Sequence, residues 1–258
     1  MLKIVTFNLR CTWTRGDGIN SFIHRAAMIT EKIEEEKPDV VCFQELVPET
    51  YEYLDHHLNG YYIQYNGRNA DYGGEGLGIA VRRDTVRMIS LDCFWLSPTP
   101  DLPASRFEEQ STCPRIAQDA LLLDLGTNRI FRVYNNHLDH ISEKARALGM
   151  TAVLERIAAD QTHVACPVFL LGDLNADPEE ACIRLAKDNE HFPLTDLTED
   201  TGITFHDFGL AREPLYKIDY IFTDPATAAK PSTCDVWRDE YNGVFLSDHY
   251  PVCVCAEI

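Results

Sequence analysis

Apolar runs that end abruptly in polar residues recur along this chain. The clearest run covers residues 167–171, whose length and continuous apolarity predict a buried strand covered on both faces. Gly172 follows and permits a sharp turn, after which the chain presents Asp173 and Asn175. We expect these two side chains to stand at a strand end, where layered α/β proteins carry functional groups.

The same patterns predict further strands on both sides of this one. The segments 75–81 and 85–95 are expected to pair as a hairpin around Arg83 and Asp84. The segment 97–115 has four prolines and no periodicity, which is typical of a long functional loop. Other strands are expected at 2–9, 39–43, 61–65, 116–125, 130–136, 218–222, 233–237 and 252–256.

Apolar residues at helical spacing predict helices between several of these strands. The helices are expected at 22–36, at 48–58, from 142 to about 160, and after Glu180. Because strands outnumber helices and alternate with them irregularly, packed sheets with helices outside are favoured over a simple βαβ repeat. No change of composition marks a linker, so we expect one domain over residues 1–258.

The charge balance is strongly acidic. The chain has 41 Asp and Glu against 23 Lys and Arg, a net charge of -18 and a pI near 4.8. Such a surface repels nucleic acid and anionic membranes and attracts divalent cations. Nucleic acid is therefore a disfavoured partner, and the lack of an apolar run of transmembrane length argues against a membrane partner.

The nine cysteines are scattered and include no Cys-x-x-Cys pair. This spacing indicates neither a structural zinc site nor a disulfide framework. Because free thiols are typical of a reducing compartment, we expect a cytoplasmic protein.

Polar residues with catalytic potential gather at the ends of the predicted strands. One such ending is an ordinary turn, whereas a series that carries only Asn, Asp, Glu and His indicates ligands collected at one edge of a sheet pair. These residues are Asn8, Glu45, His137, Asp173 with Asn175, Asp219, and Asp248 with His249.

Short motifs surround these residues and follow one another along most of the chain. They are Thr6-Phe7-Asn8-Leu9-Arg10, Phe43-Gln44-Glu45, Asn136-His137-Leu138-Asp139-His140, Gly172-Asp173-Leu174-Asn175, Ile218-Asp219-Tyr220-Ile221-Phe222 and Ser247-Asp248-His249-Tyr250-Pro251. Together they resemble the endonuclease/exonuclease/phosphatase superfamily. The resemblance implies an α/β fold in four layers, with two packed mixed β-sheets flanked by helices on both outer faces. It also implies metal-assisted hydrolysis of a phosphoester.

The resemblance assigns three of the strand-end residues to a metal site. Glu45 would bind Mg²⁺, a hard ion that prefers carboxylate oxygens, with Mn²⁺ as a substitute. Asn8 and Asp248 would complete or orient the shell of ligands. The metal would neutralise charge on the phosphate and stabilise the leaving oxygen.

The other strand-end residues are implied to act on water and phosphate. Asp173 would orient or deprotonate the attacking water, and Asn175 would donate a hydrogen bond to a phosphate oxygen. His249 would contact the phosphate, while Asp219 fixes its tautomer and favours its protonated form. His137 would be a second histidine in contact with the phosphate.

Two further residues belong to the expected site. Glu75 occupies the position from which relatives in the deoxyribonuclease branch support the second histidine, His137. Arg115 lies in a predicted loop and could hold a phosphate through two N–H groups, with a plain surface position as the alternative. Arg68 and Arg106 are further candidates for this role, but for both of them a surface position is favoured.

We therefore expect a Mg²⁺-dependent hydrolase that acts on a small phosphomonoester or phosphodiester. One alternative is a nuclease, which the acidic charge disfavours, and the other is a non-catalytic binding module of the same fold. Segments 95–100 and 113–115 are similar to bacterial members of the superfamily nearest the deadenylase-like group, a likeness that does not fix a substrate.

Overall fold

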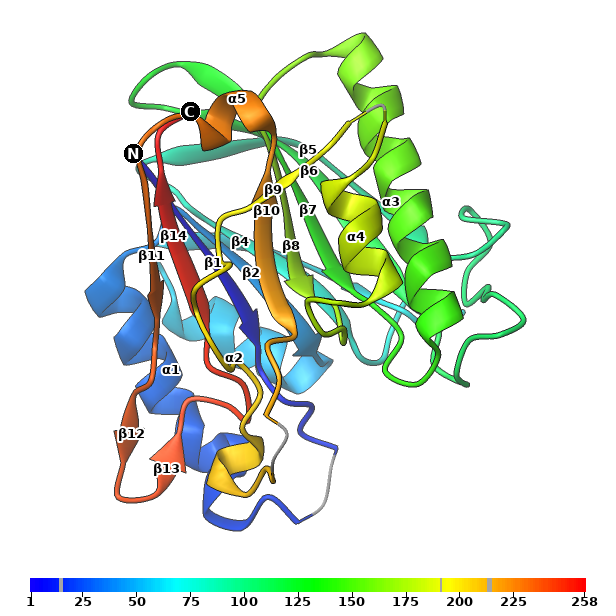
Figure 1. Cartoon of the computed structure of the whole chain (residues 1–258). Helices are drawn as coiled ribbons and strands as arrows, with labels where there is room; N and C mark the ends of the chain where they lie inside the picture. The colour runs from blue at the N-terminus through cyan, green and yellow to red at the C-terminus, as the bar shows by residue number, and fades with distance from the viewer. Residues whose placement is uncertain (14–15, 191, 213–214) are drawn as a thin grey trace.

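Two six-stranded mixed sheets pack face to face, and helices cover both outer faces (Figure 1). The computed structural model describes residues 1–13, 16–190, 192–212 and 215–258. This arrangement confirms the predicted four-layered α/β sandwich.

The first sheet has the strand order β11-β14-β1-β2-β4-β3. Its two central strands, β1 and β2, are parallel and are joined by helix α1, while the other neighbours are antiparallel. Helices α1 and α2 cover the outer face, where Ile29, Ile33 and Leu54 join its apolar cluster. The bounds are β1 (Leu2–Asn8), α1 (Phe22–Glu36), β2 (Val40–Leu46), α2 (Pro48–His57), β3 (Tyr61–Gly67), β4 (Gly76–Arg82), β11 (Ser232–Val236) and β14 (Val252–Ala256).

The second sheet has the strand order β5-β6-β7-β8-β10-β9. Again a central pair, β7 and β8, is parallel and is joined by a helix, α3. Helices α3 and α4 cover its outer face through Met150, Leu154 and Ile183. The bounds are β5 (Val86–Trp95), β6 (Ile116–Asp124), β7 (Arg129–His137), α3 (Glu143–His163), β8 (Val168–Asp173), α4 (Ala181–Lys187), β9 (Thr195–Asp196) and β10 (Asp219–Thr223).

The remaining elements are short and lie outside the two large sheets. A two-stranded ribbon pairs β12 with β13. The bounds are η1 (Gly18–Asn20), η2 (Asp207–Gly209), α5 (Pro225–Ala228), β12 (Glu240–Tyr241) and β13 (Val244–Phe245).

The layer between the sheets changes from apolar to polar along the strands. An apolar cluster fills most of it, with Ile4 and Val40 facing Val133 and Phe169 across the gap. Nearer the carboxyl ends of β1 and β2, buried amides replace the aliphatic side chains. Hydrogen bonds between these amides join the two sheets beside the strand ends.

The amide network runs continuously from one sheet to the other. Gln44 Nε2 donates to Asn135 Oδ1 at 2.8 Å, and Asn135 Nδ2 donates to Gln118 Oε1 at 3.1 Å. Gln118 Nε2 then donates back to Asn66 Oδ1 at 2.9 Å. Gln44 and Asn66 belong to the first sheet, so the network crosses the interface twice.

The predicted hairpin of residues 75–81 and 85–95 is wrong, although both strands form. β4 pairs with β2 and β3, whereas β5 pairs with β6 in the second sheet. Because β2 and β3 already occupy both edges of β4, the chain leaves the turn at Arg83 and Asp84 and crosses to the other sheet. The segment 97–115 contains no helix or strand, as the sequence predicts.

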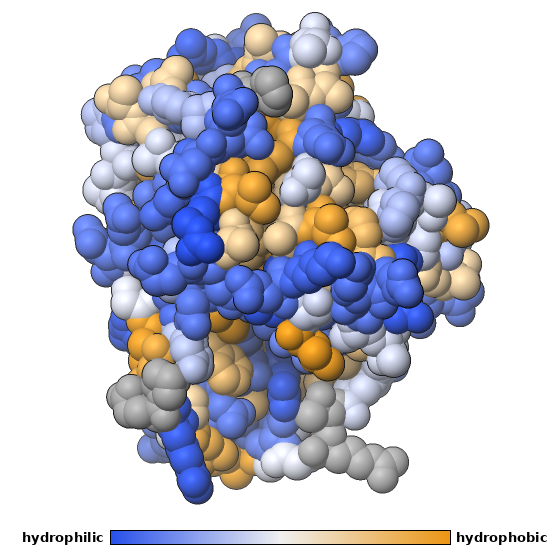
Figure 2. Space-filling model, turned by 45° about the vertical axis from the view of Figure 1, so that its right-hand side comes forward, coloured by the Kyte–Doolittle hydropathy of each residue, from blue (hydrophilic) through white to orange (hydrophobic). Residues whose placement is uncertain are grey.

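Hydrophilic side chains cover most of the face shown in Figure 2, and hydrophobic ones gather in patches near its centre. None of the helices in the described part of the chain is both long and apolar enough to cross a membrane. All the cysteines are free thiols.

Gly172 should be among the least replaceable residues of the fold. Its φ is +140°, and a Cβ there would lie 1.9 Å from the Asn136 main-chain oxygen of the neighbouring strand β7. We expect Gly172→Ala to lower the free energy of unfolding by at least about 2 kcal/mol in urea titrations. Gly60→Ala, where a Cβ has no neighbour within 4 Å, is the matched control. Equal stability of the two variants would contradict the proposed strain.

Candidate active site

A cleft of about 580 Å³ opens where strands of both sheets end. Asn8 and Asp219 lie buried beside it and hydrogen-bond to residues that line it. The structure therefore brings all the predicted site residues together. Those that line the cleft are Glu45, Glu75, Arg115, His137, Asp173, Asn175, Asp248 and His249.

Glu45 is aimed into the cleft by an irregularity in β2. The register of β2 with β4 shifts between Phe43 and Leu46, and Glu45 has a φ of 56°, which is unusual for a residue with a side chain. Its Oε2 accepts a hydrogen bond from the Cys11 main-chain N at 2.6 Å, and its Oε1 accepts one from Asn8 Nδ2 at 3.3 Å. The backbone strain thus serves to present a carboxylate.

Asp248, which is close to the C-terminus of the chain, lines the cleft near Glu45. Its Oδ2 lies 3.3 Å from Arg10 Nη1, and its main-chain oxygen accepts a hydrogen bond from the His206 N at 2.9 Å. Burial raises the pKa of Asp248, and Glu45 adds to the rise, while His249 and Arg10 oppose it. A positive charge placed near the carboxylates of Asp248 and Glu45 would therefore be stabilised.

Glu45 and Asp248 offer carboxylate oxygens to a cation, and Asn8 offers an amide oxygen. Hard divalent ions such as Mg²⁺ and Mn²⁺ prefer such donors. This donor set, with the carboxylate repulsion described for Asp248, fits a divalent metal.

Asp173 lies at the centre of the site and contacts groups from both sheets. Its Oδ2 accepts a hydrogen bond from Asn8 Nδ2 at 2.9 Å and lies 3.3 Å from His137 Nε2. Its Oδ1 accepts a hydrogen bond from the Asn175 main-chain N at 2.9 Å. Burial raises its pKa to about 7; His249 opposes the rise and Asp219 adds to it. A carboxylate with such a pKa can exchange a proton near neutrality.

Asn175 follows in the left-handed conformation, with a φ of 49°. Its side chain lines the cleft, and its Nδ2 donates to the Leu138 main-chain oxygen at 3.1 Å. The amide is therefore oriented by the turn after β7.

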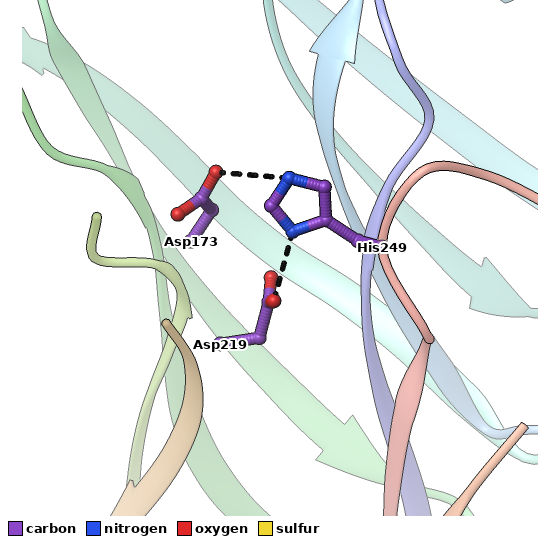
Figure 3. A group of neighbouring side chains, drawn as sticks. All are labelled: Asp173, Asp219 and His249. Atoms are coloured by element: carbon purple, nitrogen blue, oxygen red, sulfur yellow. Dashed lines mark hydrogen bonds and ion pairs between the residues drawn. The ribbon is translucent and has the colours of Figure 1, made fainter. Parts of the chain in front are cut away.

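His249 lies between two carboxylates (Figure 3). Its Nδ1 is 2.9 Å from Asp219 Oδ2, and its Nε2 is 3.8 Å from Asp173 Oδ2. Burial alone would lower the pKa of His249, but Asp219, and after it Asp173, raises it to about 10. The ring is therefore protonated at neutral pH, with Nδ1–H directed to Asp219.

Donor atoms of Asp173, Asp219 and His249 lie within 4.8 Å of one another, close enough to hold a metal ion. A protonated imidazole cannot be a ligand, however, and both ring nitrogens already face carboxylates. The oxygen-only donors of Glu45, Asn8 and Asp248 fit a hard ion better.

The ring of His137 is neutral, although it is about as deeply buried as that of His249. Burial, followed by Arg115 and Arg68, lowers its pKa well below the ordinary value, and so the ring is neutral. Within the described part of the chain, carboxylates lie against both ring nitrogens of His249 but against only Nε2 of His137, and this accounts for the difference. One cationic and one neutral imidazole therefore face the same cleft.

Two further arginines, Arg68 and Arg115, line the cleft. Arg115 is 4% exposed, and its Nη2 lies 3.0 Å from His140 Nδ1. Among the described residues its Nε and Nη1 have no hydrogen-bond partner. Glu75 makes a two-point ion pair with Arg68 and lies 3.9 Å from Arg115 Nη1.

The predicted support of His137 by Glu75 is not among these contacts within the described chain, and it stays a prediction. Arg68 lines the cleft, contrary to the favoured surface position. Arg106 lies outside the lining and bonds to the Ser111 main-chain oxygen.

Sequence reasoning missed Arg10, which pairs with both Asp248 and Asp17. Its place two residues after Asn8, at a strand end, was the available signal. It also missed Phe205, whose ring packs edge-on against His249 with centroids 5.0 Å apart. Phe205 follows no predicted strand, so no sequence pattern pointed to it.

The charge of His249 should depend on Asp219. We expect Asp219→Asn to lower the pKa of His249 from its value of about 10, because burial is then opposed only by the carboxylates of Asp173 and Asp248. NMR titration of the imidazole nitrogens measures this value. Asp101→Asn, at an exposed position of the 97–115 loop, should leave it unchanged. An unaltered pKa in Asp219→Asn would refute the assigned cause.

Solved structures with the same fold include an endonuclease/exonuclease/phosphatase from Bacteroides vulgatus, 27% identical over 100% of this chain and 98% of that chain, with a TM-score of 0.89. A functionally unknown conserved protein from Enterococcus faecalis is 30% identical over 99% and 100%, with a TM-score of 0.83. A mannosyl-6-phosphatase from Bacteroides thetaiotaomicron is 24% identical over 100% of both chains, with a TM-score of 0.85.

A family model matches residues 5–249, which includes every predicted site residue. Members of that family are metal-dependent enzymes that hydrolyse phosphoric esters. The chain belongs to the Endonuclease/Exonuclease/phosphatase family and is a phosphoric ester hydrolase.

Proposed function

We propose that this chain is a Mg²⁺-dependent hydrolase of a small phosphomonoester or phosphodiester. The observation that carries the proposal is a cleft that combines oxygen donors for a cation, a central buried acid and arginine nitrogens that lack a hydrogen-bond partner among the described residues. A binding module has no need of a metal ligand and a water-orienting acid together.

Glu45, Asn8 and Asp248 would hold the metal, and Mn²⁺ would substitute for Mg²⁺. When bound, the ion supplies positive charge that neutralises the phosphate and stabilises the leaving oxygen. Arg10, 3.3 Å from Asp248, orients that carboxylate.

Asp173 would orient the attacking water and accept its proton. Its raised pKa supports this role, because a base is most effective when its pKa lies near the working pH. Asn8 Nδ2 holds its Oδ2 in place, so the lone pairs of the carboxylate have a fixed direction.

The phosphate would contact the two histidines and Arg115, which line the same cleft. His249 is a cationic donor fixed by Asp219, and Arg115 offers two buried nitrogens, Nε and Nη1, that lack a hydrogen-bond acceptor among the described residues. An anion at this place would satisfy them, and Asn175 and His137 would contact the remaining oxygens.

The size and charge of the protein favour a small substrate. A cleft of about 580 Å³ matches the volume of ordinary small-molecule sites. The net charge of -18 repels a long polyanion, which leaves a nuclease as the second candidate. One similar structure is named a mannosyl-6-phosphatase, and sugar phosphates are therefore the first substrates to test.

The free cysteines support a reducing compartment, and we propose a cytoplasmic enzyme without a membrane partner.

Removing the proposed water-orienting acid should abolish turnover. We expect Asp173→Asn to lower kcat by about 100-fold or more, because a positioned acid-base group contributes at least that much. Initial rates on a chromogenic phosphoester measure the effect. Asp101→Asn is the control for an exposed carboxylate and should retain the parent rate. A rate within a few-fold of the parent in Asp173→Asn would remove Asp173 from this role.

Metal removal should stop the reaction reversibly. We expect excess chelator to abolish hydrolysis of a phosphate monoester and a diester, and added Mg²⁺ or Mn²⁺ to restore it. The same assays, run from low to moderate salt, distinguish the two classes of substrate. Activity on a polyanion would fall steeply as salt rises, whereas activity on a small ester would not. Turnover in excess chelator would contradict the metal-dependent mechanism.

A further inference from the structure

Arg25, in helix α1, is a buried cation that takes no part in the proposed reaction. Its side chain is fully inaccessible, and among the described residues no carboxylate forms an ion pair with it. Its guanidinium instead donates to three main-chain oxygens. A buried charge with only neutral partners is costly, and an apolar side chain would fill the same space more cheaply.

The three oxygens belong to segments far apart in the sequence. Arg25 Nη2 donates to Leu9 O at 3.0 Å, Nη1 donates to Leu246 O at 2.6 Å, and Nε donates to Asn20 O at 2.5 Å. Asn20 Oδ1 in turn accepts a hydrogen bond from the Phe245 N at 2.9 Å. One planar group therefore ties the chain that leaves β1 to the chain that precedes β14.

These two segments carry two of the three proposed metal ligands, Asn8 and Asp248. Leu9 lies between Asn8 and Arg10, and Leu246 lies two residues before Asp248. The ladder that pairs β1 with β14 ends at Thr6 and Val252, before it reaches either segment. Beyond that point the Arg25 guanidinium connects the two segments, together with the ion pair between Arg10 and Asp248.

The geometry of the guanidinium is itself restrained. The rings of Phe22 and Phe208 lie 5.9 and 5.6 Å from Arg25 Cζ. A rigid planar fork can address three oxygens in fixed directions, whereas the single ammonium of lysine on a flexible stem cannot. Both the charge and the shape of arginine are thus used.

We propose that Arg25 is a positioning residue of the metal site, which sets the separation between Asn8 and Asp248 and so the geometry of their oxygens. The inference rests on the proposed function, since it concerns the same metal. It predicts that Arg25 acts on metal affinity as well as on stability.

The test compares Arg25→Lys with Arg132→Lys in the full chain. Arg132 is also poorly exposed, and its Nη1 is 2.6 Å from Asp119 Oδ1 on strands β7 and β6, outside the cleft lining. Mn²⁺ affinity is measured from the electron paramagnetic resonance signal of free Mn²⁺, and Tm is measured on the same samples. We expect Arg25→Lys to weaken Mn²⁺ binding by about ten-fold or more, and Arg132→Lys to bind within two-fold of the parent even where its Tm falls.

Chemical rescue separates positioning from general destabilisation. Guanidinium ion at low millimolar concentration should restore Mn²⁺ affinity to Arg25→Ala, and urea at the same concentration should not. If Arg25→Ala does not fold, Arg25→Lys decides alone. Parent-like Mn²⁺ affinity in Arg25→Lys overturns the inference, whereas a parent protein that binds no Mn²⁺ overturns the proposed function as well.

Discussion

The site depends on one constraint, which is that each sheet contains a parallel strand pair whose carboxyl ends reach the same edge of the sandwich. In each sheet a helix on the outer face returns the chain so that the second strand runs alongside the first. Packing the two sheets face to face then places Asn8 and Glu45 opposite His137 and Asp173. The hydrogen bond from Asn8 to Asp173 joins the two halves directly.

Because the strand ends are buried, the protein can use desolvation to set charge. The same burial that raises the pKa of Asp173 lowers that of His137. Asp219 reverses the effect for His249 through one contact. A base, a neutral imidazole and a cationic imidazole therefore coexist in one cleft.

The sequence predicted the strands and their polar ends because a covered strand leaves a continuous apolar run and its end changes composition abruptly. Asp173 after residues 167–171 is the clearest case. The sheet to which a strand belongs leaves no such trace, so β5 was assigned to the wrong neighbour. The bulge at Glu45 and the three-way bonding of Arg25 depend on segments that meet only in the folded chain, and helical periodicity alone gave no reason to single out Arg25.

Backbone strain at the cleft gives the protein an evolutionary signature. Arg10 and Glu45 hold left-handed conformations, each of which costs about 1–2 kcal/mol for a residue with a side chain. Glycine would adopt the same backbone without that cost, but it would present neither a guanidinium nor a carboxylate. A homologue that no longer catalysed the reaction would gain stability from glycine at either position. Retention of both side chains in a divergent homologue would therefore mark continued selection for catalysis.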